Sequence, residues 1–362
     1  MSQPILDLTG DLVTLTRALC DVPSVSGDER ALADAVESAL RVLPHLEVLR
    51  DGDAVVARTH LGRTERVVVA GHLDTVPAAG NLPSQLRGSG QDAQVWGRGT
   101  VDMKSGVAVQ LALAAVVTEP TRDVTWVFYD HEEVEAALSG LGRVARNHPD
   151  WLVGDFAVLC EPTDGGIEGG CNGTLRAEVR ILGKAAHSAR GWRGINAIHA
   201  AAPVLATLAA YVPAEVAVDG LVYREGMNAV GVRGGIAGNV IPDECVVTVN
   251  YRFAPSRDLG AAERAVRELF AGFEVTVVDA AAGARPGLDH PTAQQFVSAV
   301  ATSTGRGPAP KYGWTDVARF SALGIPAVNF GPGDPALAHA DDEHCPVSQI
   351  HACHQALQAW LS

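Results

Sequence analysis

Four short apolar runs, separated by stretches of helical length, dominate the chain outside its middle part. They are Arg66–Ala70, Val124–Tyr129, Phe156–Leu159 and Pro326–Phe330. Runs that are apolar throughout, without alternation, are typical of parallel strands buried on both faces. Helical patterns lie at Ala31–Val42, Ser105–Val117 and Gln349–Leu361. The alternation predicts an α/β fold in which a mostly parallel sheet is flanked by helices.

The middle of the chain has a different pattern, which begins near Thr174. Leu175–Gly183 alternates between apolar and polar residues, as a half-buried strand does. Further strands are expected at Asn228–Ile236, Cys245–Phe253 and Glu274–Val278, and helices at Asn196–Tyr211 and Ala261–Phe273. The order βαββαβ is that of a ferredoxin-like α+β sandwich. We therefore expect an inserted domain at residues 174–283, and a discontinuous catalytic domain built from residues 1–173 and 284–362.

The composition narrows the classes of partner. The 362 residues carry a net charge of −14, with few aromatic residues and no basic cluster, which argues against a nucleic-acid or membrane partner and favours a small-molecule substrate. No apolar stretch approaches the ~20 residues needed to cross a bilayer, and the amino-terminal stretch lacks the pattern of a secretion signal. The six cysteines are scattered without a CxxC pair, so we expect reduced thiols and a cytoplasmic protein.

Five segments that follow short apolar runs carry acidic residues or histidine. They are Gly71–Thr75 (GHLDT), Gly99–Gly106 (GTVDMKSG), Asp130–Glu135 (DHEEVE), Cys160–Thr163 (CEPT) and Gly331–Glu343 (GPGDPALAHADDE). Ligands bind at the carboxyl ends of strands in open α/β sheets. Imidazole and carboxylate donors gathered from several loops are typical of zinc sites. The joint occurrence of these donors predicts a metal centre.

Each motif by itself also has an ordinary structural explanation. An isolated histidine is more often a surface residue than a metal ligand. The pair Glu132–Glu133 could be the solvated first turn of a helix, and an aspartate after a strand often caps a helix. Only the coincidence of five such segments favours the metal interpretation. A serine hydrolase is disfavoured because the chain has no GxSxG motif, and a P-loop is disfavoured because no glycine directly precedes Lys104.

These motifs resemble those of the zinc-dependent amidohydrolases and exopeptidases that include aminoacylase, acetylornithine deacetylase, glutamate carboxypeptidase and succinyl-diaminopimelate desuccinylase. The resemblance covers nearly the whole chain, including the inserted domain. The stretches at Gly220–Val230, Gly238–Pro255 and Gly313–Pro335 are most similar to the actinobacterial desuccinylases. The resemblance implies hydrolysis of an N-acyl amino acid, with N-succinyl-LL-2,6-diaminopimelate as the expected substrate. A related deacylase, such as an acetylornithine deacetylase, and a catalytically silent binding protein are the alternatives.

The resemblance also implies roles for individual residues. Two Zn²⁺ ions are implied, with Co²⁺ as an alternative in one site. Asp102 would bridge them, with His72 and Glu161 completing one site and Glu133 and His339 the other. Asp74 would support His72, Glu132 would be the general base, and the peptide after Asp102 is often cis in relatives.

On the inserted domain, the family pattern implies that His187 reaches the active site of a partner subunit and stabilises the oxyanion. The domain would thus serve as a lid and as the contact of a homodimer. Asn239, Arg252 and Thr315 match positions that hold the substrate. His339 and His344 are both candidate ligands by spacing alone, and the family pattern of a histidine followed by an acidic pair selects His339.

Overall fold

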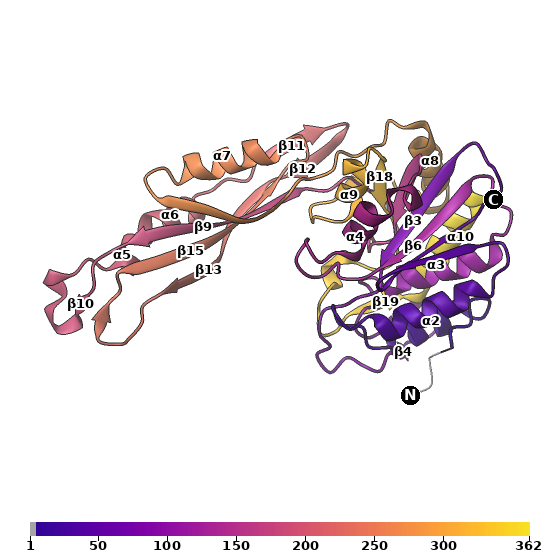
Figure 1. The fold of residues 1–362 in the computed structure, drawn as a ribbon, viewed down its shortest axis with the longest axis horizontal. Coiled ribbons are helices and arrows are strands. Elements are labelled where there is room, and N and C mark those ends of the chain that lie inside the picture. Colours follow the sequence, from indigo (N-terminus) through magenta and orange to yellow (C-terminus); the bar gives the residue numbers. More distant parts are fainter. Residues whose placement is uncertain (1–4) are drawn as a thin grey trace. The chain divides into compact units, whose positions relative to one another are not determined.

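The computed structural model describes residues 5–362, and the chain divides into two compact units. Unit 1 comprises the chain up to Gly169, Gly287–Ala309 and Arg319–Ser362, and unit 2 comprises Gly170–Pro286 and Pro310–Ala318 (Figure 1). Unit 2 therefore takes in a short second segment that lies outside the expected range of 174–283. In the described part of the chain, no helix combines the length and the apolar content needed to cross a membrane.

Unit 1 is built on an eight-stranded mixed sheet. The strands, in spatial order, are β1 (Glu47–Asp51), β2 (Ala54–Arg58), β6 (Asp123–Tyr129), β3 (Arg66–His72), β7 (Phe156–Leu159), β18 (Ala327–Asn329), β8 (Glu168–Gly169) and β17 (Ala309–Pro310). The four central strands, β6, β3, β7 and β18, pair in parallel, and each corresponds to one predicted apolar run. Antiparallel strands extend the sheet on both sides. The α/β fold class is confirmed, with antiparallel edges that the apolar runs did not indicate.

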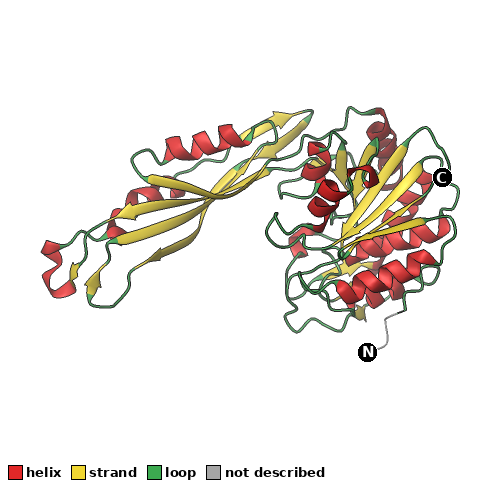
Figure 2. Ribbon diagram, in the orientation of Figure 1, coloured by secondary structure: helices red, strands yellow, loops and turns green. Residues whose placement is uncertain are grey.

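Helices flank this sheet (Figure 2). They are α1 (Leu12–Cys20), α2 (Arg30–Arg41), α3 (Lys104–Val116), α4 (Gly140–Asn147), α8 (Pro291–Thr304), α9 (Val317–Ala322) and α10 (Val347–Leu361). The largest apolar core of the unit joins the inner faces of α1, α2, α3 and α10 to the central strands. Helix α3 packs on β3 and also contacts α1 and α10. A small sheet, β19 (His344–Pro346), β5 (Gln94–Trp96) and β4 (Gln85–Arg87), completes the unit.

Unit 2 has the ferredoxin-like arrangement. Its main sheet has the order β13 (Gly226–Gly234), β15 (Glu244–Phe253), β9 (Gly173–Leu182) and β16 (Glu274–Ala281), with all neighbours antiparallel. Alternate residues of β9 and β15 point into a separate core, which explains their period-2 pattern. The helices are α5 (Ala197–Ala200), α6 (Ala202–Ala209) and α7 (Leu259–Leu269), and the short strands β10 (Ala186–His187) and β14 (Val240–Ile241) form a separate pair.

Two helix predictions in unit 2 were wrong in detail. The single helix expected over Asn196–Tyr211 is split into α5 and α6, because Pro203 has no N–H and is tolerated only in the first turn of a new helix. Helix α7 begins two residues before the predicted Ala261, since Asp258 caps it by accepting a hydrogen bond from the Ala261 amide. It also ends at Leu269, four residues before the predicted end.

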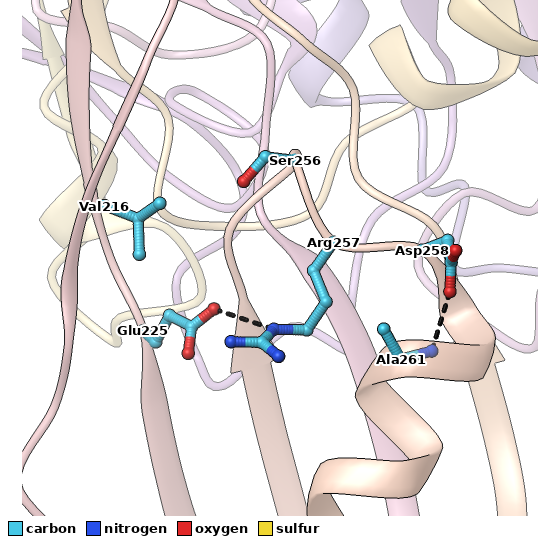
Figure 3. A pocket seen from close by; sticks show the side chains of 6 residues that line it. All are labelled: Val216, Glu225, Ser256, Arg257, Asp258 and Ala261. Atoms are coloured by element: carbon cyan, nitrogen blue, oxygen red, sulfur yellow. Dashed lines mark hydrogen bonds and ion pairs between the residues drawn. The ribbon is translucent and has the colours of Figure 1, made fainter.

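A hairpin that was not predicted, β11 (Glu215–Val218) with β12 (Leu221–Arg224), borders a pocket in unit 2. Figure 3 shows the residues that line the pocket, Val216, Glu225, Ser256, Arg257, Asp258 and Ala261. Glu225 is buried and accepts hydrogen bonds from the Tyr251 hydroxyl at 2.8 Å, the Ala254 amide at 3.0 Å and Arg257 Nε at 3.3 Å. The carboxylate thus ties the residue after β12 to the end of β15, which is a structural role.

Candidate metal centre

The donors predicted from the sequence come from the carboxyl ends of the central strands and from two loops, all within unit 1. His72 is the last residue of β3, Glu132 and Glu133 follow β6, and Glu161 follows β7. Asp102 lies between β5 and α3, and its peptide bond to Met103 is cis. His339 lies in the loop after β18.

The six side chains meet in overlapping clusters. One potential ligand atom from each of His72, Asp102 and Glu161 lies within 4.8 Å of the others. The same holds for Asp102, Glu133 and His339, and for His72, Glu132 and Glu133. Asp102 is shared by the first two clusters, with its Oδ1 3.0 Å from His72 Nε2 and its Oδ2 3.4 Å from His339 Nε2. An aspartate with one oxygen toward each cluster has the geometry of a bridging ligand.

The hydrogen bonds of His72 identify its tautomer. His72 Nδ1 lies 2.9 Å from the backbone carbonyl of Asp74, which can only accept, so Nδ1 carries a proton. In the neutral ring, Nε2 then presents its lone pair to the cluster, as a metal-binding imidazole must. The Asp74 carboxylate is farther away, with 3.5 Å between His72 Nδ1 and Oδ1. The close support of His72 therefore comes from the backbone of Asp74, whereas the resemblance implied Asp74 without specifying the atom.

The Asp74 side chain instead holds the loop after β6. Its Oδ1 accepts the amide hydrogen of Glu132 and its Oδ2 that of Glu133, each at 3.0 Å. The Ser26 hydroxyl donates to Oδ2 at 2.7 Å. Burial raises the pKa of Asp74, but the hydrogen bonds and the charge of His72 outweigh burial and lower that pKa to about 2. Asp74 thus stays ionised and orients two neighbouring glutamates through their backbone.

Electrostatics test whether these residues suit a cation. Burial disfavours a charged His72, but Asp102 and Asp74 outweigh it and hold the pKa of His72 well above its usual range. Hydrogen bonds with Asp102 and Glu133 raise the pKa of His339 to about 10. Three carboxylates, those of Asp74, Asp102 and Glu133, thus favour the protonated form of the two imidazoles. Divalent cations would neutralise the same carboxylates, and oxygen and nitrogen donors of this kind are those zinc uses, so the donor set fits a two-ion centre.

The choice between His339 and His344 is decided by position. His339 Nε2 lies 2.9 Å from Glu133 Oε1. His344 belongs to β19, and its Nδ1 contacts the carbonyl of Asp342 at 2.6 Å. The structure therefore brings His339 into the cluster.

The remaining predicted residues lie in unit 2. His187 is exposed at the end of β10, and its Nδ1 accepts a hydrogen bond from the Ala189 amide at 3.1 Å. Asn239 is exposed, Thr315 is buried, and Arg252 is half-buried on β15, with Nε donating to Asn250 Oδ1 at 3.1 Å. Their predicted roles stay predictions.

Sequence reasoning missed several residues that surround the cluster, among them Ser26, Arg98, Met103 and Glu343. Met103 Sδ accepts the His72 amide hydrogen at 3.3 Å. Arg98 and Glu343 each stand four residues from a predicted ligand, Asp102 and His339 respectively. That spacing from a predicted ligand was the only feature of the sequence that pointed to these two residues. Their ion pair joins segments about 240 residues apart, and such a contact leaves no periodic pattern in a sequence.

Comparison with known proteins identifies the family of the chain. A model of peptidase family M20/M25/M40 matches residues 68–362. The chain belongs to this family. It is 54% identical over 360 residues to a Mycobacterium tuberculosis protein provisionally named succinyl-diaminopimelate desuccinylase DapE, with 99% of each chain covered. It is 49% identical over 370 residues to the succinyl-diaminopimelate desuccinylase of Corynebacterium glutamicum, covering 99% of this chain and 98% of that protein.

Solved structures share the fold. A tripeptidase from Staphylococcus aureus matches with a TM-score of 0.79 at 19% identity, covering 99% of this chain and 98% of that one. A Bacillus subtilis protein described as a dinuclear metal-binding M20 peptidase matches with a TM-score of 0.70 at 17% identity, covering 97% and 96%. The resemblance inferred from the sequence is confirmed, and the chain is a metal-dependent hydrolase of the M20 family.

Proposed function

We propose that the protein removes succinate from N-succinyl-LL-2,6-diaminopimelate at a centre that holds two zinc ions. The convergence of two donor clusters on Asp102 carries the two-ion part of the proposal. The substrate rests on the full-length identity to proteins named for this reaction. In this proposal His72, Asp102 and Glu161 hold one ion, and Asp102, Glu133 and His339 hold the other. Co²⁺ is the alternative metal in one site.

When bound, the two ions supply Lewis acidity, which polarises an amide carbonyl and lowers the pKa of water. Glu132 is the proposed general base. Its backbone is held by Asp74, and one of its carboxylate oxygens lies within 4.8 Å of ligand atoms of His72 and Glu133. The side chain is half-buried, so it can exchange a proton with water inside the centre and deliver that proton to the departing amine.

His187 is the proposed oxyanion donor. Because its Nδ1 accepts the Ala189 amide hydrogen, the proton of the neutral ring is on Nε2, which is then free to donate. An oxyanion donor of this kind contributes roughly 3–4 kcal/mol to transition-state stabilisation. Arg252, Asn239 and Thr315 are the proposed substrate contacts, with the Arg252 guanidinium suited to a succinyl carboxylate.

We also propose that the protein acts as a homodimer through unit 2 and that His187 serves the partner's centre. The edge strand β13 supports the dimer, because it pairs with β15 on one side only and its residues 228–234 are exposed. Val230 and Val232 there are more than half exposed. Exposed apolar edge strands favour pairing with another chain. A cytoplasmic location is consistent with the six buried, unbridged cysteines.

The decisive experiment measures kcat/KM on N-succinyl-LL-diaminopimelate and on N-acetylornithine, together with the zinc content of the same sample. We expect two zinc ions per chain and a preference of about 100-fold or more for the succinyl substrate, because a site that pairs with a carboxylate rejects a substrate lacking it. A preference for N-acetylornithine would assign the chain to a different deacylase. Two bound ions with no hydrolysis of either substrate would favour a silent binding protein.

A further inference from the structure

A buried ion pair joins the two loops that carry Asp102 and His339. Arg98 Nη1 donates to Glu343 Oε2 at 2.8 Å, and the two side chains are 4% and 1% exposed. Both residues belong to unit 1. Neither is among the six donors of the centre. Burying a charged pair is costly unless its geometry and further hydrogen bonds compensate, so the other contacts of the pair show what it organises.

The Arg98 side chain donates hydrogen bonds to backbone carbonyls of the loop that carries His339. Nη2 donates to the carbonyl of His339 and Nη1 to that of Ala340, each at 3.3 Å. Nε donates to the carbonyl of Pro77 at 3.2 Å. The planar guanidinium thus spreads its donors over a carboxylate and three carbonyls, an arrangement that suits arginine and not lysine.

The Glu343 carboxylate accepts hydrogen bonds from backbone amides of the loop that carries Asp102. The other carboxylate oxygen, Oε1, accepts the amide hydrogen of Val101 at 2.8 Å and that of Asp102 at 3.2 Å. One oxygen of Glu343 is therefore committed to the bridging aspartate and the other to Arg98. The chain of contacts runs from the Asp102 amide through Glu343 and Arg98 to the His339 carbonyl.

His339 needs such support more than the other imidazole does. His72 ends the central strand β3, where it pairs with Tyr129 of β6, and its side chain is 1% exposed. The side chain of His339 is 51% exposed, and His339 lies ten residues beyond the end of β18. Its φ of 65° is in the left-handed region, which non-glycine residues rarely adopt. Such a backbone conformation persists only where surrounding contacts enforce it.

We infer that Arg98 and Glu343 are positioning residues for the ion site formed by Asp102, Glu133 and His339. The pair sets the distance between the bridging carboxylate and His339, and the site formed by His72, Asp102 and Glu161 depends on it less. This inference rests on the proposed two-ion centre. It goes beyond the ligand set, because it assigns the second ion's affinity to two residues that do not touch the ion.

Two conservative variants break the link without creating a cavity. In Glu343→Gln, one oxygen must be replaced by an NH2 group. Either the Val101 and Asp102 amides or the Arg98 guanidinium then faces a donor instead of an acceptor. In Arg98→Lys, the positive charge stays, but a single ammonium cannot reach the same set of acceptors.

Asp123→Asn is the matched control. Asp123 is also a buried carboxylate in unit 1, and it accepts two backbone amides, from Leu61 and Arg63, and the hydroxyl of Thr59. It lies at the start of β6, at the opposite end of the strand from Glu132. The Asp123→Asn variant therefore shows the effect of weakening a buried carboxylate's hydrogen bonds at a position away from the metal centre.

The experiment measures zinc bound per chain by equilibrium dialysis over buffered free-zinc concentrations, with His339→Ala as the reference for loss of the second site. We expect Arg98→Lys and Glu343→Gln to lower the affinity for the second ion by ~10–100-fold, and that for the first by less than about threefold. Asp123→Asn is expected to bind both ions as the wild type does. The thermal midpoint of each apo protein is measured in parallel.

Wild-type affinity for both ions in the two variants would overturn the inference. So would a loss of both ions in equal measure, since that is the result of a general structural defect. Hydrolysis does not enter this readout. A wild-type protein that binds two ions but does not cleave the succinyl substrate would contradict the proposed function and leave the inference standing.

Discussion

At the scale of single residues, the centre depends on backbone contacts as much as on the ligands. Asp74 binds the amides of Glu132 and Glu133, and Glu343 binds the amide of Asp102. These contacts fix the backbone position from which each of these acidic side chains extends. Two adjacent glutamates can therefore take different roles, one as a proposed ligand and the other as a proposed base, although they share one loop.

Glu132→Gln tests that division of roles. The amide keeps the size of the side chain and leaves the backbone bond to Asp74 in place, but it cannot take a proton from water. We expect kcat for the succinyl substrate to fall by ~10²–10⁴-fold or more while two ions remain bound, measured by steady-state kinetics and metal analysis.

Glu135→Gln is the control for this variant, since Glu135 lies in the same loop and is exposed. It is expected to keep wild-type kinetics. A Glu132→Gln protein that turns over normally would remove Glu132 from the mechanism, and one that has lost its metal would make Glu132 a ligand.

Three of the donor residues, His72, Glu133 and Glu161, were predictable from the sequence because each follows an apolar run that predicts a strand. Parallel strands bring their carboxyl ends together, so His72, Glu133 and Glu161 had to come close. The contacts of Ser26, Arg98 and Glu343 were not predictable. They depend on loops that meet only in three dimensions, and their residue types are common at surfaces.

At the scale of elements, strands β3, β6 and β7 and helix α3 agree with their predictions to within two residues, since continuous apolar runs leave little ambiguity. The hairpin β11–β12 was missed although its turn, Asp219–Gly220, has the Asp-Gly pair typical of a two-residue turn. Both residues have positive φ, 47° and 86°. The two strands joined by this turn are only four residues long, which is too short for a clear alternation of apolar and polar residues.

Helix α3 must approach the segment that follows β7 closely, and Gly106 allows it. A Cβ at Gly106 would lie 2.1 Å from the carbonyl oxygen of Cys160, the residue before Glu161. We expect Gly106→Ala to lower the free energy of unfolding by ~1–3 kcal/mol, as overpacking does, measured by urea denaturation of the apo protein. Because the displaced segment carries Glu161, zinc affinity at the His72–Asp102–Glu161 site is expected to fall first.

Gly307→Ala is the control for the backbone effect, since a Cβ at Gly307 meets no heavy atom within 4 Å. It is expected to leave stability and metal content unchanged. Wild-type stability in Gly106→Ala would show that α3 can shift without consequence for β7.

The buried carboxylate at the start of β6 gives a pH prediction. Burial raises the pKa of Asp123. Hydrogen bonds from the Leu61 amide, the Thr59 hydroxyl and the Arg63 amide outweigh burial and lower this pKa below its usual value. A carboxyl group whose pKa is depressed on folding stabilises the protein above its unfolded pKa of about 4, and this contribution is lost as the pH falls through the folded pKa.

We therefore expect Asp123→Asn to cost ~1–3 kcal/mol at pH 7, with a difference from the wild type that shrinks below about pH 4. Urea denaturation of both apo proteins at pH 7, 5 and 3 measures it. A difference that stayed constant or grew toward pH 3 would contradict the assignment of Asp123 as an ionised, hydrogen-bonded group.

At the scale of the whole molecule, the proposed dimer depends on β13. We expect the wild type to have twice the mass of one chain by light scattering, and Val232→Lys to be monomeric with an unchanged thermal midpoint, because a charge on an exposed edge strand opposes pairing. Val278→Lys is the matched control. Val278 lies on β16, the opposite edge strand of the same sheet, and is 48% exposed against 54% for Val232.

Exchange of His187 between subunits can be tested by mixing two inactive variants. His187→Ala keeps its own Glu132 and lacks the donor, and Glu132→Gln keeps the donor and lacks the base. If each centre takes His187 from its partner, a mixed dimer contains one complete centre, formed by the base of one chain and the donor of the other. Random reassociation of equal amounts makes half of all dimers mixed, so about a quarter of the wild-type rate should return. If His187 instead serves its own chain, no mixed dimer holds a complete centre, and the mixture stays as inactive as its components.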